Sequence, residues 1–280
     1  MKIFTENLYK KYNQTITIEK IIARQKSKYQ NILIFDSKYF GRILTLDKVV
    51  QITEFDHYYY SEMLSHLPII SHGNIRKVLI IGGGDGAIAS EVLKHNSIKE
   101  IFICEIDKDV IDLSNKYLKK INCESLKSPK VNIVIEDASK FISKDNFKNY
   151  FDLIIADRPD PIGPGKKLFQ LEFYKNIKKA LSNNGIAVFQ NGVPFFQKDE
   201  LKDAKKQLKS IFKYSGIYLT VVPTYIGGYM ALTWSSNKIN LTKPKNIDKK
   251  SQIIKKLYTK YYTKEIHRSS FNLPQWIKEI

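Results

Sequence analysis

Two aspartates stand three residues apart in the segment DRPDPIGPGKKLF, residues 157–169. Asp157 follows the apolar run FDLIIA, which predicts a buried strand, and Asp160 lies in a turn with three prolines and two glycines. In open α/β sheets, ligands bind beyond the carboxyl ends of the strands. Two carboxylates on a stiff loop at such an edge could hold an organic cation, a metal ion or a proton, and this loop alone does not decide among them.

Acidic residues also follow three other predicted strands: Asp85 in the glycine turn of residues 82–86, Glu105 after the second strand and Asp137 after the third. Glycines allow a sharp turn and close approach to a ligand, and an acid about 20 residues later is placed for ribose hydroxyls. Any single acid could instead cap a helix or a turn. Together with Asp157, they favour a cationic nucleoside such as S-adenosylmethionine or a relative. NAD is disfavoured, because these acids would repel its pyrophosphate.

Alternating strands and helices from Lys77 onward must position these acids. The pattern predicts a Rossmann-like doubly wound α/β sheet that ends in an antiparallel strand pair. A surface connection, a helix and a docked tail should follow. Strands are expected at 77–84, 100–107, 131–139, 151–157, 186–192, 218–225 and 230–236, and helices at 87–95, 108–118, 172–185, 201–213 and 253–262, with Phe271, Leu273 and Trp276 anchoring the tail.

The front of the chain has a different pattern. Runs at 15–25, 29–37 and 42–53 alternate apolar and polar residues and predict a small antiparallel sheet, followed by a helix over 54–70. We therefore expect an N-terminal β-sheet domain over residues 1–65. A Rossmann-like catalytic domain with a C-terminal helix and tail should then span residues 66–280.

The composition limits the partners. The formal net charge is +18, which would suit an anionic partner such as nucleic acid or a membrane surface. The lysines are spread along the chain in company with many Ile, Asn and Tyr, as in proteins of AT-rich genomes, and we favour that explanation. The sequence has neither an apolar run long enough to span a membrane nor a signal-peptide core. Two cysteines, Cys104 and Cys123, predict a cytoplasmic protein without a disulfide framework.

Several segments resemble the spermidine synthase (polyamine aminopropyltransferase) family, bacterial type, over nearly the whole chain. They are VLIIGGGDGAIASEVLKH, CEID, IIADRPDPIGPGKKLF, QNGVPFF and PTYIGGYM, joined by FGRILTLDKVVQITE and the tail from His267 to Pro274. The combination of GGGDG with DxxDPxGP is specific, whereas either motif alone is not. The resemblance implies a class I methyltransferase-like fold and a homodimer, with a tetramer as the alternative. It also implies transfer of the aminopropyl group of decarboxylated S-adenosylmethionine to putrescine, giving spermidine and methylthioadenosine, with no metal and no other cofactor.

The resemblance also implies residue roles. Asp157 would accept a proton from the attacking amine, and Asp160 would help to hold the diamine. Trp234 would form either an apolar wall beside the methylenes or part of the core. The implied diamine site comprises Asp157, Asp160, Tyr60, Tyr225 and Asp85. The implied cosubstrate site comprises Gln30, Gln51, Ser61, Gly82, Gly84, Asp85, Glu105, Asp137, Ala138 and Pro164.

Some positions depart from the family pattern. Arg158 and Pro159 stand where small polar residues are usual, and we expect Arg158 to point outward, because adjacent side chains diverge. Ser61 replaces a common His or Gln, Ala138 a common glycine, and Ser90 a common arginine. The rival functions are an S-adenosylmethionine-dependent methyltransferase on the same sheet and a non-catalytic nucleic-acid-binding protein. Cadaverine, agmatine and spermidine remain alternative acceptors, because they differ from putrescine mainly in length.

Overall fold

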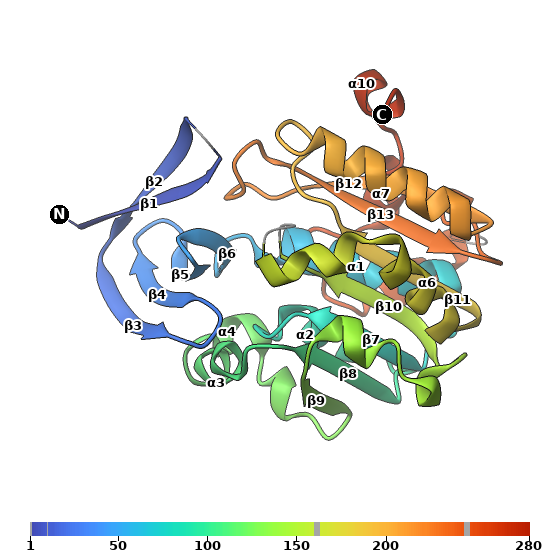
Figure 1. Ribbon diagram of the computed structural model, residues 1–280, viewed down its shortest axis with the longest axis horizontal. Coiled ribbons are helices and arrows are strands. Elements are labelled where there is room, and N and C mark those ends of the chain that lie inside the picture. Colours follow the sequence, from blue (N-terminus) through green and yellow to red (C-terminus); the bar gives the residue numbers. More distant parts are fainter. Residues whose placement is uncertain (1, 10, 160–162, 244–246) are drawn as a thin grey trace.

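The computed structural model describes residues 2–9, 11–159, 163–243 and 247–280. Across these ranges one mixed sheet of seven strands dominates the molecule (Figure 1). Its order is β12 (Tyr214–Val221), β13 (Tyr229–Ser236), β11 (Leu181–Gln190), β10 (Phe151–Asp157), β7 (Lys77–Gly82), β8 (Glu100–Glu105) and β9 (Val131–Ile135). Strands β9, β8, β7, β10 and β11 are parallel, whereas β13 is antiparallel to β11 and β12. The doubly wound sheet and its antiparallel pair are therefore confirmed.

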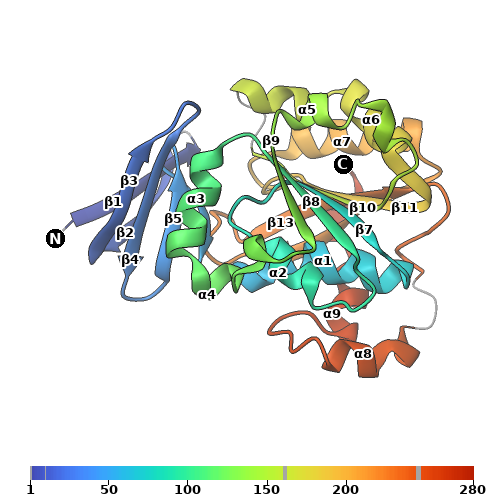
Figure 2. The same ribbon diagram turned by 90° about the horizontal axis from the view of Figure 1, so that it is seen from below.

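Helices cover both faces of this sheet (Figure 2). In β7, Val78 and Ile80 pack toward the face covered by α1 and α2, whereas Leu79 and Ile81 pack toward the opposite helices. All four side chains are at most 1% exposed, which explains why this strand is apolar throughout. One face carries α1 (His57–His72), α2 (Ala87–Leu93), α8 (Ser251–Lys255) and α9 (Lys264–Ser269), and the other carries α5 (Ala138–Phe141), α6 (Leu171–Ala180) and α7 (Lys198–Ile211).

The strand order creates a crevice between β7 and β10. The chain passes outward from β7 through β8 to β9 and then returns to β10 on the other side of β7. Loops that leave adjacent strands in opposite directions open a ligand site at such a switch point. Because Asp157 is paired with Gly82 at this edge, the acidic loop and the glycine turn meet there.

The N-terminal strands form two sheets in the described residues, where a single small sheet was expected. A hairpin of β1 (Lys2–Tyr9) and β2 (Tyr12–Ile18) packs through Phe4 and Ile16 on an antiparallel sheet of β3 (Lys20–Lys26), β4 (Asn31–Ser37), β5 (Gly41–Leu46) and β6 (Val49–Thr53). The first strand was not predicted individually. Glu6 takes one of its inward positions and accepts a 2.9 Å hydrogen bond from the Val50 backbone N–H, so a charge interrupts the apolar pattern.

An apolar contact holds the four-stranded sheet beside the carboxyl edge of the large sheet. Ile32 and Leu44 pack against Val110 of α3 (Lys108–Tyr117) and Ile121 of α4 (Lys119–Asn122). Helix α1 starts after a short turn that follows β6, and it runs under the large sheet (Figure 2). The division of the chain at residue 65 falls inside α1 and stays a prediction.

Two predicted helices end five or more residues earlier than expected. The helix expected over 172–185 ends at Ala180, because Leu181 is extended, with φ −69° and ψ 137°, and starts β11. The helix expected over 253–262 is reduced to α8, since Tyr258 has a φ of 51° and the following backbone bonds to Glu62 instead.

The tail is docked, as predicted. Phe271 packs against the main core, and Leu273 and Trp276 pack beside Ile277 of α10 (Gln275–Lys278). Over the described ranges, no helix is long and apolar enough to cross a bilayer.

Candidate active site

A cleft opens at the carboxyl edge of β7 and β10, and it encloses about 460 Å³ of empty space that is partly open to solvent. Among the described residues in its lining, three are aspartates and none is a lysine or an arginine. The cleft is therefore a locally acidic site on a chain with a net charge of +18. The lining comprises Gln51, Ile52, Asp56, His57, Tyr60, Ser61, Asp85, Ala87, Ile88, Asp157, Val222 and Tyr225.

Asp157 sits at the end of β10 with its backbone against the glycine turn. Gly82 has a φ of +78°, and a Cβ atom there would come within 2.0 Å of the Asp157 carbonyl oxygen. A side chain at position 82 would therefore push the two strand ends apart. Burial, reinforced by the negative charge of Asp85, raises the pKa of Asp157 to about 7. The carboxyl group can consequently gain or release a proton near neutral pH.

Two tyrosines present hydroxyl groups at this cleft. The Tyr60 hydroxyl donates a 2.7 Å hydrogen bond to Asp157 Oδ1, and the Tyr225 hydroxyl donates a 2.7 Å hydrogen bond to the Gln51 carbonyl oxygen. The ring centroids are 6.1 Å apart. Burial raises the pKa of both phenols well above the ordinary value, so both remain protonated donors at neutral pH.

The glycine turn brings Asp85 and Glu105 to the same edge. Asp85 Oδ1 accepts a 2.7 Å hydrogen bond from the Ala87 N–H, and burial raises its pKa. A Cβ atom at Gly84 would lie 3.0 Å from Glu105 Oε2, so the turn passes directly over that carboxyl group. Burial raises the pKa of Glu105 to about 7. Three partly buried acids are thus gathered at the ends of β7, β8 and β10.

The small sheet contributes two glutamines in different ways. Gln51 lines the cleft, and its side-chain amide donates a 3.2 Å hydrogen bond to the Val49 carbonyl oxygen. Gln30 lies outside that lining, and its Nε2 donates a 2.9 Å hydrogen bond to Asp107 Oδ2. Asp107 also accepts a 2.6 Å hydrogen bond from Ser27 Oγ, which ties the β3–β4 turn to the start of α3.

The remaining predicted nucleoside residues lie outside the cleft lining or outside the described part of the chain. Asp137 caps α5 and accepts hydrogen bonds from Ser139; burial opposes ionisation, but these bonds lower the pKa of Asp137. Ala138 is buried beside it. Asp160 lies outside the described residues, and Pro164 falls in the 3₁₀ segment η3 (Gly163–Phe169), with its side chain outside the described part.

We expected Arg158 to point outward, but its side chain enters the protein instead, because its guanidinium finds carbonyl and aromatic partners there. It is 2% exposed, and its guanidinium lies 3.8 Å from the ring centroid of Phe169. It donates hydrogen bonds to the carbonyl oxygens of Leu168 and Gln190 and to the Tyr174 hydroxyl. Arg158 therefore fastens the far end of the acidic loop.

Sequence reasoning missed Asp56 and His57. Asp56 accepts hydrogen bonds from Thr53 Oγ1 and from both the N–H and Oγ1 of Thr224, so it joins the start of α1 to the loop that carries Tyr225. An aspartate just before a helix is also typical of a simple cap, and its long-range partner gave no local signal. Trp234 is 1% exposed in the core and is absent from the cleft lining.

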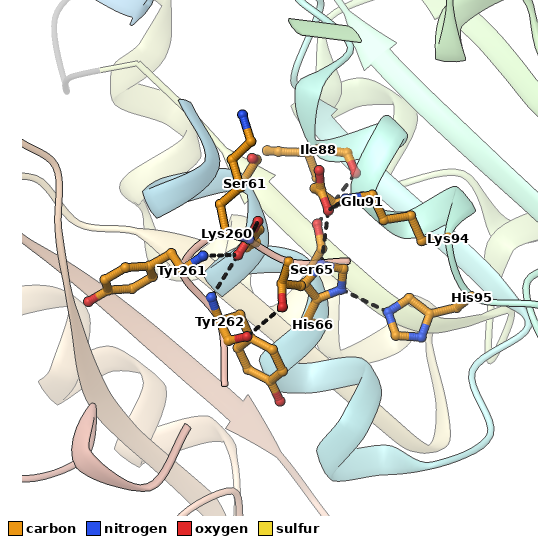
Figure 3. A network of polar contacts seen from close by, with 12 residues as sticks. Ser61, Ser65, His66, Ile88, Glu91, Lys94, His95, Lys260, Tyr261 and Tyr262 are labelled. Atoms are coloured by element: carbon orange, nitrogen blue, oxygen red, sulfur yellow. Dashed lines mark hydrogen bonds and ion pairs between the residues drawn. The ribbon is translucent and has the colours of Figure 1, made fainter. Parts of the chain in front are cut away.

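A polar network holds α1 from its other side (Figure 3). His66 lies between Glu91 and His95, with 2.9 Å separations to each, and Glu62 accepts backbone hydrogen bonds from residues 260–262. These contacts hold the helix that carries Tyr60. In the described ranges, no group of three His, Cys, Asp or Glu side chains is placed to hold a metal ion.

Comparisons with known proteins place this geometry in a wider context. Residues 57–246 match the family model described as spermine/spermidine synthase domain, and residues 3–54 match the spermidine synthase tetramerisation domain. A polyamine aminopropyltransferase from Ruegeria sp. (strain TM1040) is 41% identical, covering 99% of this chain and 97% of that protein. One from Buchnera aphidicola subsp. Schizaphis graminum (strain Sg) is 44% identical, covering 99% and 96%.

Two solved structures are also similar. A spermidine synthase in complex with the transition state analogue AdoDATO has a TM-score of 0.93 at 34% identity, covering 99% of this chain and 94% of that chain. Spermidine synthase from Thermotoga maritima has a TM-score of 0.90 at 33% identity, covering 99% and 93%.

Proposed function

Since the chain belongs to the spermine/spermidine synthase family, we propose that it is a polyamine aminopropyltransferase that makes spermidine from putrescine and decarboxylated S-adenosylmethionine. The observation that carries this proposal is the meeting of Asp157, Asp85 and Tyr60 in an acidic cleft. Both substrates are cations, and a cleft lined by aspartates attracts them. A methyltransferase needs a nucleoside site but does not require Asp157 and two tyrosine hydroxyls at the acceptor side.

Asp157 is the proposed proton acceptor. A primary ammonium group has a pKa of about 10 in water and cannot attack while it is protonated. Asp157 takes this proton, directly or through water, and the pKa of about 7 places its carboxylate near the value that suits a general base. Tyr60 holds the carboxylate, and Asp160 and Tyr225 are proposed to bind the diamine.

The chemical step is a displacement at carbon. The uncharged amine nitrogen attacks the aminopropyl carbon beside the sulfonium sulfur, so a C–N bond forms while the C–S bond breaks. The electron pair of the broken bond stays on sulfur, which leaves as the neutral thioether of methylthioadenosine. No acid is needed to assist this leaving group. Much of the remaining acceleration should come from alignment of nitrogen, carbon and sulfur.

The nucleoside roles are proposals of the same kind. Glu105 binds the ribose hydroxyls where the backbone of Gly84 passes over it, and Asp85 binds the aminopropyl ammonium. The adenine contacts fall to Asp137, Ala138 and Pro164. The other proposed nucleoside contacts are Gly82 in the glycine turn, Ser61 on α1, and Gln30 and Gln51 on the small sheet.

Membership of this family also supports proposals about the oligomeric state, the cosubstrate and the cellular location. The N-terminal match to a tetramerisation domain supports an oligomer of this chain, a homodimer or a tetramer. Decarboxylated S-adenosylmethionine acts as a cosubstrate, and no further cofactor is proposed. The cytoplasm is the proposed location, where Cys104 and Cys123 remain free thiols.

One incubation tests this function. The protein is mixed with putrescine and either decarboxylated or ordinary S-adenosylmethionine, and the products are separated by chromatography. Spermidine and methylthioadenosine should form only with the decarboxylated nucleoside. Methylated product from ordinary S-adenosylmethionine would support the methyltransferase instead. Cadaverine, agmatine and spermidine in parallel incubations establish the preferred acceptor.

A further inference from the structure

Asp56 joins the end of β6 to the loop that carries Tyr225. Its Oδ1 atom accepts a 2.7 Å hydrogen bond from Thr53 Oγ1, and its Oδ2 atom accepts bonds of 2.8 and 2.7 Å from the N–H and Oγ1 of Thr224. We call this group of three residues, each at most 2% exposed, the Asp56 clasp. Because protein groups occupy both carboxylate oxygens, Asp56 is placed to act on a substrate through the residues that it holds.

A second contact beside the Asp56 clasp fixes the phenol ring of Tyr225, which lines the cleft and is partly exposed. The Tyr225 hydroxyl donates a 2.7 Å hydrogen bond to the Gln51 carbonyl oxygen. Gln51 lies two residues before Thr53, and Tyr225 directly follows Thr224, so both contacts connect the same two segments. Since the hydroxyl proton is committed to Gln51, the phenol oxygen retains lone pairs, and an ammonium group is a suitable donor to them.

The loop of residues 222–228, which connects β12 to β13, is attached to the rest of the site at Thr224. Within the loop, the first N–H donates a 2.7 Å hydrogen bond to the last carbonyl oxygen. Gln14 Nε2 of β2 donates a 2.7 Å bond to the Thr224 carbonyl oxygen, so with Asp56 every polar group of Thr224 is bonded to a segment outside the loop. The position of Thr224 therefore sets where the next side chain, Tyr225, begins.

We propose that Asp56 is a positioning residue for the amine acceptor: by holding Thr224, it keeps the Tyr225 hydroxyl in place at the cleft wall. This inference rests on the proposed function, in which Tyr225 binds the diamine. The Tyr225 ring is 6.1 Å from that of Tyr60, which donates its hydrogen bond to Asp157, so the clasp supports the acceptor side. The proposed nucleoside contacts on β6 and at the ends of β7 and β8 are held by sheet pairing without it.

Thr224→Val is the first variant to test, because it removes one hydroxyl bond while Asp56 keeps its charge and its other two bonds. Thr224→Ser restores the hydroxyl. Ser182→Ala is the matched control: Ser182 Oγ donates a 3.0 Å bond to Asp152, which also accepts two backbone N–H bonds, at the amino end of β10. Steady-state kinetics on the full chain measure kcat and the KM of putrescine and of decarboxylated S-adenosylmethionine.

We expect Thr224→Val to raise the KM of putrescine roughly fivefold, because one hydrogen bond that places the acceptor contact is lost. The kcat and the KM of the nucleoside should change less than about twofold, and Thr224→Ser and Ser182→Ala should match the wild type. In a Tyr225→Phe background, Thr224→Val should add less than about twofold, since the clasp acts through that hydroxyl. Asp56→Asn is the second variant and should show the same pattern, because its single amide oxygen cannot serve both threonines.

An unchanged KM of putrescine in Thr224→Val, an equal rise for both substrates, or an undiminished rise in the Tyr225→Phe background would overturn the positioning role. A rise of the same size in Ser182→Ala would also overturn it, because any lost hydroxyl bond would then have this effect. Failure of the wild type to make spermidine would remove the proposed function, and this role with it. An active wild type with an unaffected Thr224→Val removes only the role of the Asp56 clasp.

Discussion

The Tyr60 hydroxyl donates a 2.7 Å hydrogen bond to Asp157 Oδ1, although the two residues are 97 positions apart in the sequence. The bond joins α1 to the end of β10 across the cleft. It orients the carboxyl group and partly offsets the effect of burial, which, together with Asp85, raises the pKa of Asp157 to about 7. At neutral pH the Asp157 carboxyl group is therefore partly ionised. It can accept a proton, although its surroundings disfavour the charged form.

The pH dependence of turnover should report this group. With decarboxylated S-adenosylmethionine saturating, kcat/KM for putrescine should fall about tenfold per pH unit below the pKa of Asp157, because a protonated carboxyl cannot accept a proton. The midpoint of this fall should lie at or below about pH 7, since the positive charge of the bound cosubstrate lowers the pKa of Asp157 from its raised value of about 7. The pKa of Glu105 is also raised to about 7, but saturation with the nucleoside keeps Glu105 bound, so its titration should not contribute to the profile. A profile that is flat from pH 5 to 8 would exclude Asp157 as the titrating base.

Stability should depend on pH with the opposite sign. The folded state holds the Asp157 proton to a pKa of about 7, whereas the unfolded chain releases it near 4. The stabilising contribution of the Asp157 carboxyl group to the free energy of unfolding is therefore fully present below about pH 4 and is lost as the pH rises through about 7. Asp157→Asn cannot ionise and can still accept the Tyr60 bond, so its melting temperature should exceed that of the wild type by roughly 2–4 °C at pH 8 and by less at pH 5. A larger gain at pH 5 would contradict this reasoning.

Replacing Arg158 with serine should loosen the acidic loop. The change removes hydrogen bonds to two carbonyl oxygens and Tyr174 and the stack on Phe169. We expect a loss of about 2–3 kcal/mol in the free energy of unfolding, measured in urea, and a fall of roughly tenfold in kcat/KM. Arg158→Lys keeps the charge but not the planar fork, so it should not restore stability. If the lysine variant matches the wild type, charge alone matters at this position.

Asp107 should act on the nucleoside through Gln30. Asp107→Ala frees Gln30 Nε2 and Ser27 Oγ and removes the cap of α3. We expect a rise of roughly 5- to 10-fold in KM for decarboxylated S-adenosylmethionine with little change in kcat, and a stability loss of about 1 kcal/mol from the cap. Gln30→Ala should reproduce the KM effect without the stability loss. Strictly additive effects in the double variant would show that the two residues act independently.

The sequence predicted the large sheet well because its central strands β7 and β10 are largely buried on both faces and nearly continuously apolar. The acids at the strand ends followed from that assignment. The outward orientation expected for Arg158 was wrong, since its partners Leu168, Tyr174 and Gln190 lie 10 to 32 positions away in the sequence. The N-terminal hairpin was harder to predict, since Glu6 occupies an inward position and obtains its partner from β6. The early end of α6 depended on pairing between Phe151 and Leu181, which no local pattern reveals.

Within the site, the residue types were predictable but their partners were not. The Tyr225 hydroxyl bonds to a carbonyl 174 positions away, and Thr224 meets Asp56 across 168 positions. Such contacts depend on how the small sheet and α1 dock on the large one. His57 escaped prediction for the same reason, because its place in the cleft lining becomes visible only when the cleft is assembled.

The most direct test of Asp157 as the proton acceptor is the kcat of Asp157→Asn at pH 8, with both substrates saturating, beside its affinity for decarboxylated S-adenosylmethionine. Asparagine preserves the size of the side chain and the acceptor for Tyr60 but cannot take the proton. We predict a fall in kcat of about 10²- to 10⁴-fold with nucleoside affinity nearly unchanged. A kcat close to that of the wild type would contradict the assignment of Asp157 as the base.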